Sequence, residues 1–334
     1  MNRYIELRNI LSQKKYFKIV CGAGNEDPGE VRKLALIYTL AGATGIDVSA
    51  NVEVVEAAMK GIDKAYDMAA LIGKQIQTRP FINVSVGLKG DPHVRKAEID
   101  VQKCSQCGLC LAVCEQDAID KDLNIETARC IGCGKCALIC QSDAVTFYTR
   151  QVAFNEILPR CLDAGAENLE LHAIIENDDA VMSDWRTIDG LVQNNFVSIC
   201  LDRSQLSDSH LINRINAVCK ISGERTIIQA DGAPMSGGSD DFNTTLQAVA
   251  IADIIHKSKI PVMILASGGT NSKTGELARM CRVSLNGVSI GTFARKIVRH
   301  LTASENFETN LGLIKNAVDI AEKLVHDNLR EIQG

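Results

Sequence analysis

The chain has 334 residues, of which 46% are apolar and 23% are charged. This composition is typical of a globular protein, and the length suits one large α/β domain or two domains of ordinary size. No apolar run approaches the roughly 20 residues of a membrane helix, and the charged N-terminus lacks the apolar core of a signal peptide. The net charge is −5 without a basic cluster. We therefore expect a cytoplasmic protein that has no membrane span and does not bind nucleic acid.

Eight short runs rich in Val and Ile predict buried parallel strands, because most of them end in Gly, Asp, Ser or Asn, as strands that feed loops do. In chain order they cover residues 17–24, 45–50, 81–87, 168–174, 196–202, 226–232, 261–269 and 287–292. Apolar residues recur with a helical period in the segments between them. The predicted helices cover residues 28–43, 52–78, 151–165, 178–194, 207–222, 240–258 and 274–281, with one or two more in 311–332.

This alternation of strands and helices predicts a TIM-like (β/α)8 barrel, and a doubly wound open sheet is the competing architecture. We expect the barrel to comprise residues 1–98 and 149–310. A ferredoxin-like domain at residues 99–148 would be inserted after the third strand, and residues 311–334 would form a helical extension. The insertion would then lie on the face where barrels carry their active sites.

Eight of the 13 cysteines lie between Cys104 and Cys140. Residues 104–114 (CSQCGLCLAVC) and 130–140 (CIGCGKCALIC) both have the C-x2-C-x2-C-x3-C spacing of bacterial two-cluster ferredoxins, in which each fourth cysteine binds the other cluster. Zinc is the alternative, but it favours CxxC pairs with longer intervals. We predict two [4Fe–4S] clusters, one held by Cys104, Cys107, Cys110 and Cys140, the other by Cys130, Cys133, Cys136 and Cys114.

The two cysteine runs are internal repeats, because EQDAI follows the first and QSDAV follows the second. Ferredoxins of this type usually have proline after the fourth cysteine, whereas Glu115 and Gln141 stand here. This departure removes no ligand, but it indicates different hydrogen bonding around the clusters. The five other cysteines lie in apolar contexts, and we interpret them as buried small side chains, with Cys21 left open because it lies near a strand end.

The loops after the seventh and eighth strands are candidates for a phosphate site. Barrels often bind phosphate with these two loops, including the phosphate of flavin mononucleotide (FMN), and glycines let backbone N–H groups approach an anion closely. The alternative is that the glycines serve tight packing. The candidate residues are Gly268, Gly269, Thr270, Asn271, Gly291 and Thr292.

The loop DGAPMSGG after the sixth strand is longer than a simple connection requires, so we expect it to contact a substrate or cofactor. Its candidate residues are Asp231, Gly232, Met235 and Ser236, and His172 from the fourth strand is a further candidate for the same pocket. Polar residues in or near other strand ends could line this pocket, although each alone is more often a satisfied core group: Asp47, Asn83, Asp202 and Gln229. No Ser-His-Asp arrangement, Walker loop or Rossmann fingerprint is present.

Several segments carry a family resemblance: FKIVCGAG, YTLAGATGIDVSAN, IIQADGAPMSGG, LASGGTNSKT and GVSIGTFARKIV. Through them the chain resembles the light-dependent-period iron–sulfur protein family of cyanobacteria, whose members feed redox state into the circadian clock. The resemblance runs from about Phe17 to Val298. It implies an iron–sulfur protein that responds to or transmits cellular redox state, with quinones as candidate ligands, and it does not extend to a clock role here.

Three functions follow as hypotheses. The first is an electron-transfer or redox-sensing protein that exchanges electrons with a redox partner, a complex subunit or a barrel-bound ligand. The second is an FMN-dependent barrel oxidoreductase whose inserted clusters deliver the electrons. The third is a lyase or aldolase acting on a phosphate-bearing small molecule. That reaction needs a Schiff-base lysine or a metal site, and neither is evident: the one strand lysine, Lys18, is expected at the entering end of its strand. We favour the first hypothesis.

Overall fold

The computed structural model describes residues 2–22, 24–87, 94–149, 153–233, 236 and 238–334. Eight parallel strands close into a barrel in the order β1-β10-β9-β8-β7-β6-β3-β2. The predicted barrel is confirmed, and the open sheet is excluded because β1 pairs with both β2 and β10. The strands are β1 (Tyr16–Val20), β2 (Gly45–Ser49), β3 (Phe81–Gly87), β6 (Asn168–His172), β7 (Val197–Leu201), β8 (Thr226–Asp231), β9 (Met263–Ser267) and β10 (Gly287–Ile290).

Helices surround this barrel, and their apolar faces pack on its outer surface to form the main core. Several begin at a side-chain cap; for example, Asp27 accepts hydrogen bonds from the N–H groups of Gly29 and Glu30 at the start of α2. The helices are α2 (Pro28–Leu40), α3 (Val52–Ala69), α6 (Phe154–Asp163), α7 (Asp178–Leu191), α8 (Asp208–Ser222), α9 (Phe242–Lys257), α10 (Thr274–Met280) and α11 (Thr292–Thr302). Short 3-10 turns are η1 (Ala70–Ile72), η3 (Gly223–Arg225) and η4 (Phe307–Thr309).

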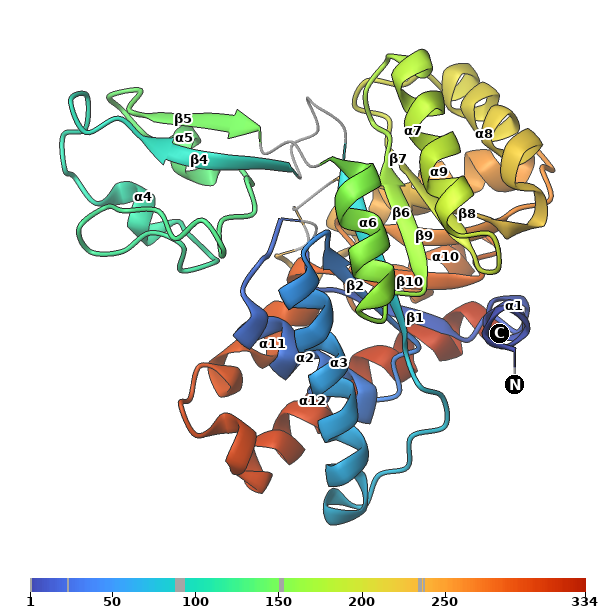
Figure 1. Ribbon diagram of the computed structural model, residues 1–334, viewed down its shortest axis with the longest axis horizontal. Helices are drawn as coiled ribbons and strands as arrows, with labels where there is room; N and C mark the ends of the chain where they lie inside the picture. Colours follow the sequence, from blue (N-terminus) through green and yellow to red (C-terminus); the bar gives the residue numbers. More distant parts are fainter. Residues whose placement is uncertain (1, 23, 88–93, 150–152, 234–235, 237) are drawn as a thin grey trace.

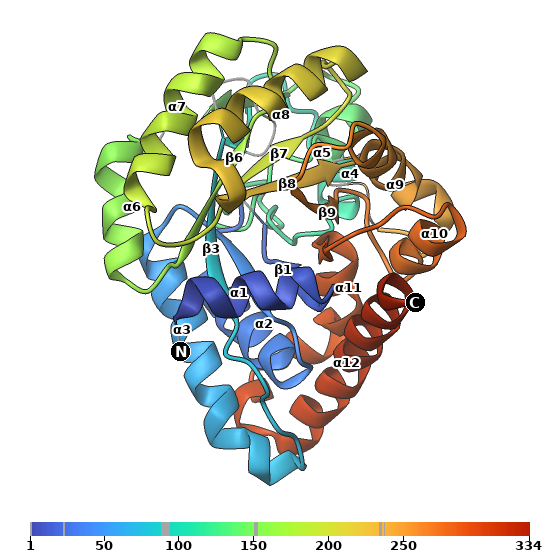
Figure 2. The same cartoon turned by 90° about the vertical axis from the view of Figure 1, so that its right-hand side faces the viewer.

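Two further helices complete the outer layer. Helix α1 (Arg3–Ser12) crosses the end of the barrel where the strands begin, and Leu7 and Leu11 pack there in a second core with Tyr16 and Phe81 (Figure 2). Helix α12 (Leu311–Gln333) is one continuous helix that packs against α2, α10 and α11. Within the described residues, no helix combines the length and apolarity needed to cross a membrane.

The inserted module stands beside the barrel and follows its third strand (Figure 1). It contains β4 (Arg95–Ile99), α4 (Leu109–Ala112), α5 (Lys135–Ile139) and β5 (Val145–Thr149). Strand β4 pairs antiparallel with β5 and not with the barrel. The two strands of the module extend slightly beyond the expected bounds of 99–148, and those domain bounds stay a prediction.

The two cysteine repeats have matching backbones. Three equivalent positions in each repeat have positive φ, where glycine or a residue tolerant of the left-handed region is needed. The matched positions are Gln106 and Gly132, Gly108 and Gly134, and Asp117 and Asp143. The sequence repeat is therefore also a structural repeat.

Candidate functional site

The structure brings four of the predicted ligands together around one pocket of the module. Cys114, Cys130, Cys133 and Cys136 line this pocket, with Ala97, Ala118, Ile119, Ile125 and Phe147 among the apolar residues around them. Burial raises the pKa of the Cys136 thiol to about 11, and the nearby thiols Cys133, Cys130 and Cys114 add to this rise. Cys114 therefore lies with the three cysteines of the other repeat, and their binding of one cluster stays a prediction.

Backbone N–H groups point at the sulfur atoms of both repeats, so the module fits a group bound through thiolates. The N–H of Ala118 lies 3.4 Å from the Cys114 sulfur, and the N–H of Ala144 lies 3.3 Å from the Cys140 sulfur at the equivalent place. The Cys130 sulfur accepts from the N–H of Ala97. Such donors stabilise the negative charge on cluster-binding sulfur.

The other predicted set is arranged around the N-terminus of α4. Cys110 is buried, and its thiol is close enough to Cys104 and Cys107 for their charges to raise its pKa, after burial as the main cause. Helices α4 and α5 pack against each other, and Cys140 directly follows α5. The assignment of Cys140 to this set stays a prediction.

A buried lysine joins the second cysteine set to the barrel. Lys96 on β4 is 2% exposed, and its ammonium donates hydrogen bonds to the carbonyl oxygens of Cys130 (2.8 Å) and Thr127 (2.9 Å) in the module. The same ammonium donates to the carbonyl of Gly24 (2.5 Å) and lies 3.5 Å from the Glu26 carboxylate, both in the loop that follows β1. No pattern in the sequence indicates this contact, since a lysine in a strand is usually exposed.

Further polar contacts cross the same junction. Arg129 in the module pairs with Asp27 at the cap of α2 at 3.1 Å. On the opposite side, Arg295 of α11 donates to the side-chain oxygen of Gln116 at 2.9 Å, and Arg299 pairs with Asp117 at 2.9 Å. The module therefore contacts both the loop after β1 and the last helix of the barrel, α11.

The predicted phosphate loops are engaged in contacts within the barrel. A Cβ on Gly268 would lie 1.6 Å from the Asp231 carboxylate, and one on Gly269 would lie 2.1 Å from the carbonyl oxygen of Thr244. Thr270 donates to the carbonyl of Ser289. These contacts are those of tight packing between loops, and a bound phosphate or flavin at this place stays a prediction.

The other residues of these loops are placed as follows. The Asn271 side chain donates to the carbonyls of Ser239 and Asp241. Gly291 precedes α11, and Thr292 is the first residue of that helix. A Cβ on Gly291 would make only ordinary contacts, the nearest at 3.4 Å from the Val20 side chain.

Two of the pocket candidates converge, whereas the others do not. His172 and Asp231 lie at the ends of β6 and β8, and both approach Cys200 of the intervening strand β7. Gly232 packs against the backbone of Ala248. A Cβ on Gly232 would lie 2.5 Å from the Ala248 backbone nitrogen. Ser236 is exposed and donates to the Ala233 carbonyl of its own loop. Met235 lies outside the described residues.

The inside of the barrel holds a polar network that sequence reasoning largely missed. The Lys18 ammonium is fully buried, lies 2.5 Å from the Glu170 carboxylate and is 3.6 Å from that of Asp47. Lys18 is the middle residue of β1, so its expected position at the strand entrance was wrong. Ser85 donates to Asp47, and Ser198 donates to Glu170. The pocket candidates Asp47 and Gln229 belong to this network. The alternation of polar and apolar residues along each strand indicates that they point into the barrel.

Charge in this network is strongly coupled. Burial opposes the ionisation of Glu170, but the Lys18 ammonium and nearby hydrogen-bond donors outweigh it and lower the pKa of this carboxyl group. Burial raises the pKa of Asp47, and the Glu170 charge adds to that rise while Lys18 opposes it. Lys18 therefore serves mainly as the counter-ion of Glu170.

Comparisons with known proteins agree with the module and with most of the barrel. Residues 161–327 match the Light dependent period A C-terminal domain, and residues 97–120 and 123–146 each match the 4Fe-4S binding domain. The protein Light dependent period A of Synechococcus elongatus (strain ATCC 33912 / PCC 7942 / FACHB-805) is 31% identical over 285 residues, which cover 84% of this chain and 78% of that protein.

Similar solved structures include two aldolases. A putative fructose-1,6-biphosphate aldolase from Coccidioides immitis is 8% identical with a TM-score of 0.48, over 99% of this chain and 96% of that one. The YdjI aldolase from Escherichia coli K12 is 6% identical with a TM-score of 0.44, over 97% and 93%. The sequence matches, in contrast, extend over both the iron–sulfur motifs and the C-terminal half, so the chain belongs to the Light dependent period A family of 4Fe–4S binding proteins.

Proposed function

We propose that this protein is a redox sensor that exchanges electrons with a partner through its module and transmits the redox state of the module to the barrel. Bound [4Fe–4S] clusters supply one-electron chemistry. The eight module cysteines supply the thiolates, with Cys114 and Cys140 exchanged between the repeats. The N–H groups directed at sulfur offset part of the negative charge.

The contact that carries this proposal is the one between Lys96 and Cys130. The buried ammonium bonds to the backbone of a cluster ligand and, on its other side, to the loop between β1 and α2. An added electron near the Cys130 sulfur strengthens the attraction to this ammonium in a water-poor site. This stronger attraction then alters the contacts of the same ammonium with the carbonyl of Gly24 and the carboxylate of Glu26.

Electron exchange is tested by a titration of the anaerobically purified protein. Stepwise reduction, followed by electron paramagnetic resonance (EPR), should give two reducible [4Fe–4S] signals with potentials inside the family-wide range of roughly −700 to +450 mV. Clusters that stay silent over that range would contradict the proposed electron exchange.

The module exposes an apolar side chain on α5 that is available to a partner protein. Leu138 is 89% exposed and lies between two predicted ligands, Cys136 and Cys140. We propose that a redox protein docks over α5. With cytochrome c as the probe acceptor, Leu138→Gln should slow reoxidation of the reduced protein several-fold, whereas Leu71→Gln, at a 67% exposed position in the turn η1 of the barrel, should not. Equal rates for the two variants would remove α5 as the docking face. A quinone as the acceptor should be insensitive to both substitutions.

A further inference from the structure

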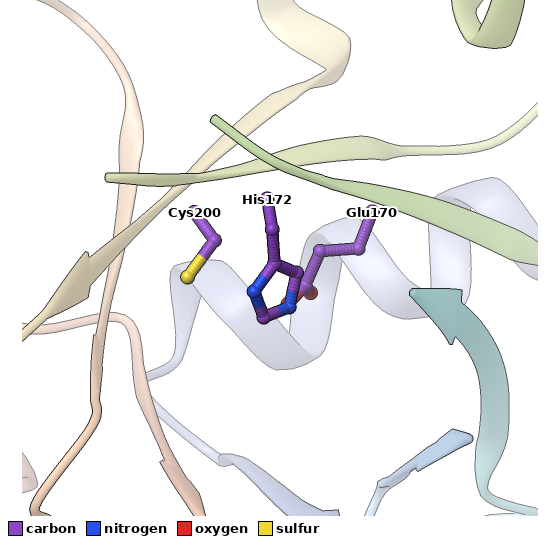
Figure 3. Close-up of side chains that lie close together, drawn as sticks. All are labelled: Glu170, His172 and Cys200. Carbon is purple, nitrogen blue, oxygen red and sulfur yellow. The ribbon is translucent and has the colours of Figure 1, made fainter. Parts of the chain in front are cut away.

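Three potential metal ligands meet at the mouth of the barrel, well apart in the sequence from the eight module cysteines. Glu170 and His172 lie two residues apart on β6 and point to the same side of that strand, and Cys200 comes from β7, where it is paired with His172 (Figure 3). One carboxylate oxygen, one imidazole nitrogen and the sulfur all lie within 4.8 Å of one another. All three residues are buried.

The separation of the imidazole and the carboxylate suits a shared metal ion. His172 Nε2 lies 3.6 Å from Glu170 Oε1, which is longer than an ordinary hydrogen bond. Two ligand atoms at about 2.1 Å from a tetrahedral zinc ion are about 3.4 Å apart. The observed distance is therefore close to one edge of a zinc coordination sphere.

The other oxygen of Glu170 is already held by the barrel. Oε2 accepts hydrogen bonds from Lys18, Ser198 and Gln229, which come from β1, β7 and β8. These donors fix the orientation of the carboxylate and leave Oε1 directed toward His172. Outer partners of this kind commonly orient carboxylate ligands of metal ions.

Asp231 provides a second, independent sign of a cation. It is 3% exposed, and its Oδ2 accepts a hydrogen bond from the Cys200 sulfur at 3.1 Å. Its Oδ1 is buried without a hydrogen-bond partner among the described residues. Three carboxyl groups, those of Asp47, Glu170 and Asp231, share this interior with the Lys18 ammonium and the His172 imidazole. A divalent cation between Cys200 and Asp231 would compensate this excess of buried negative charge.

We propose that Cys200, His172 and Glu170 bind one zinc ion at the barrel mouth, with Asp231 as the fourth ligand or as the acceptor for a zinc-bound water. The mixed sulfur, nitrogen and oxygen donor set is typical of zinc rather than of calcium or magnesium, which prefer oxygen alone. When zinc binds, the Cys200 proton is released to solvent and the Cys200–Asp231 hydrogen bond is replaced by coordination.

The test is a metal analysis of the intact, anaerobically purified protein after incubation with zinc and desalting. The proposal predicts about one zinc per chain beside about eight iron atoms. Cys200→Ser and His172→Gln should each lower the zinc content at least several-fold and leave the iron content unchanged. Cys219→Ser, which replaces a half-buried cysteine of α8, is the matched control and should keep both metals.

Zinc-edge X-ray absorption on the unmodified protein makes the test independent of how the variants fold. One sulfur at about 2.3 Å and two or three lighter atoms at about 2.0–2.2 Å are expected. Four sulfur neighbours would place the zinc in the cysteine-rich module and overturn the proposal. The proposal would also be overturned if the protein retained no zinc, or if Cys200→Ser and the unmodified chain had the same zinc content.

Discussion

The ammonium of Lys96 and the carbonyl oxygen of Cys130 lie 2.8 Å apart in a buried position, where the module meets the barrel. Cys130 lines the pocket of the second cysteine set, and Lys96 also reaches the barrel loop at Gly24. One side chain therefore links a predicted cluster ligand to the barrel beside the module.

Lys96→Met should destabilise the protein and change one cluster selectively. Its loss leaves three buried carbonyl oxygens without their charged donor, which should cost about 3 kcal/mol in the free energy of unfolding. Removal of a nearby positive charge should also lower the reduction potential of the second cluster and leave that of the first nearly unchanged. Chemical denaturation and an EPR-monitored titration measure the two effects. Lys121→Met, at an exposed position in the same module, is the control; equal shifts in both variants would show that Lys96 has no special role.

Pairs of cysteine substitutions test the exchange of ligands between the repeats. Cys114→Ser and Cys133→Ser should each remove or convert the same cluster, because both side chains line one pocket. The double variant Cys114→Ser, Cys133→Ser should therefore keep the first cluster and about half of the iron. Cys110→Ser combined with Cys133→Ser should affect both clusters.

Iron and sulfide analysis with EPR distinguishes these cases, with Cys281→Ser as the control outside the module. If the variant lacking Cys114 and Cys133 lost both clusters, the two cysteines would belong to different sets.

Gly269→Ala should destabilise the barrel whether or not any anion binds there. The residue has a φ of 71°, and a Cβ would lie 2.1 Å from the Thr244 carbonyl oxygen, so we expect a loss of about 2 kcal/mol or more. Gly291→Ala has room for its Cβ and should change the free energy of unfolding by less than about 1 kcal/mol. Thermal and chemical unfolding provide the comparison. Similar losses of unfolding free energy in both variants would mean that backbone crowding does not explain the effect of Gly269→Ala.

Lys18→Met should be among the most damaging single substitutions in the barrel. It leaves the buried carboxylates of Glu170 and Asp47 without their counter-ion, which should cost about 3–5 kcal/mol. The additional substitution Glu170→Gln should recover part of that loss. Lys257→Met, which removes an exposed pair with Asp253, should have little effect. A Lys18→Met protein as stable as the unmodified one would show that the network tolerates unpaired charge.

The barrel could be predicted because its strands have a strong apolar signal and a regular spacing. All eight were found, although the first was predicted to reach Gly24 and ends at Val20, because the chain turns at Gly22 with a φ of 113°. The cysteine motifs were equally clear, since their spacing follows from the geometry of the cluster.

Other parts of the site depend on distant contacts that no local pattern encodes. Cys200 was interpreted as a buried small side chain, and nothing around Ile199 and Leu201 shows that Asp231 and His172 lie beside it. Lys96 likewise looks like an ordinary strand residue until Gly24 and Cys130 are brought together. The polar residues of NLELH alternate with leucine, and the same alternation in GIDVS and FINVSVG was a sign of a polar barrel interior.

The most direct test of redox sensing is hydrogen exchange of the oxidised and reduced protein, measured under anaerobic conditions. We expect reduction to change the protection of residues 24–27 in the loop after β1, and we expect Lys96→Met to abolish this difference while both clusters are still reduced. Identical exchange of that loop in the two redox states of the unmodified protein would contradict transmission from the module to the barrel.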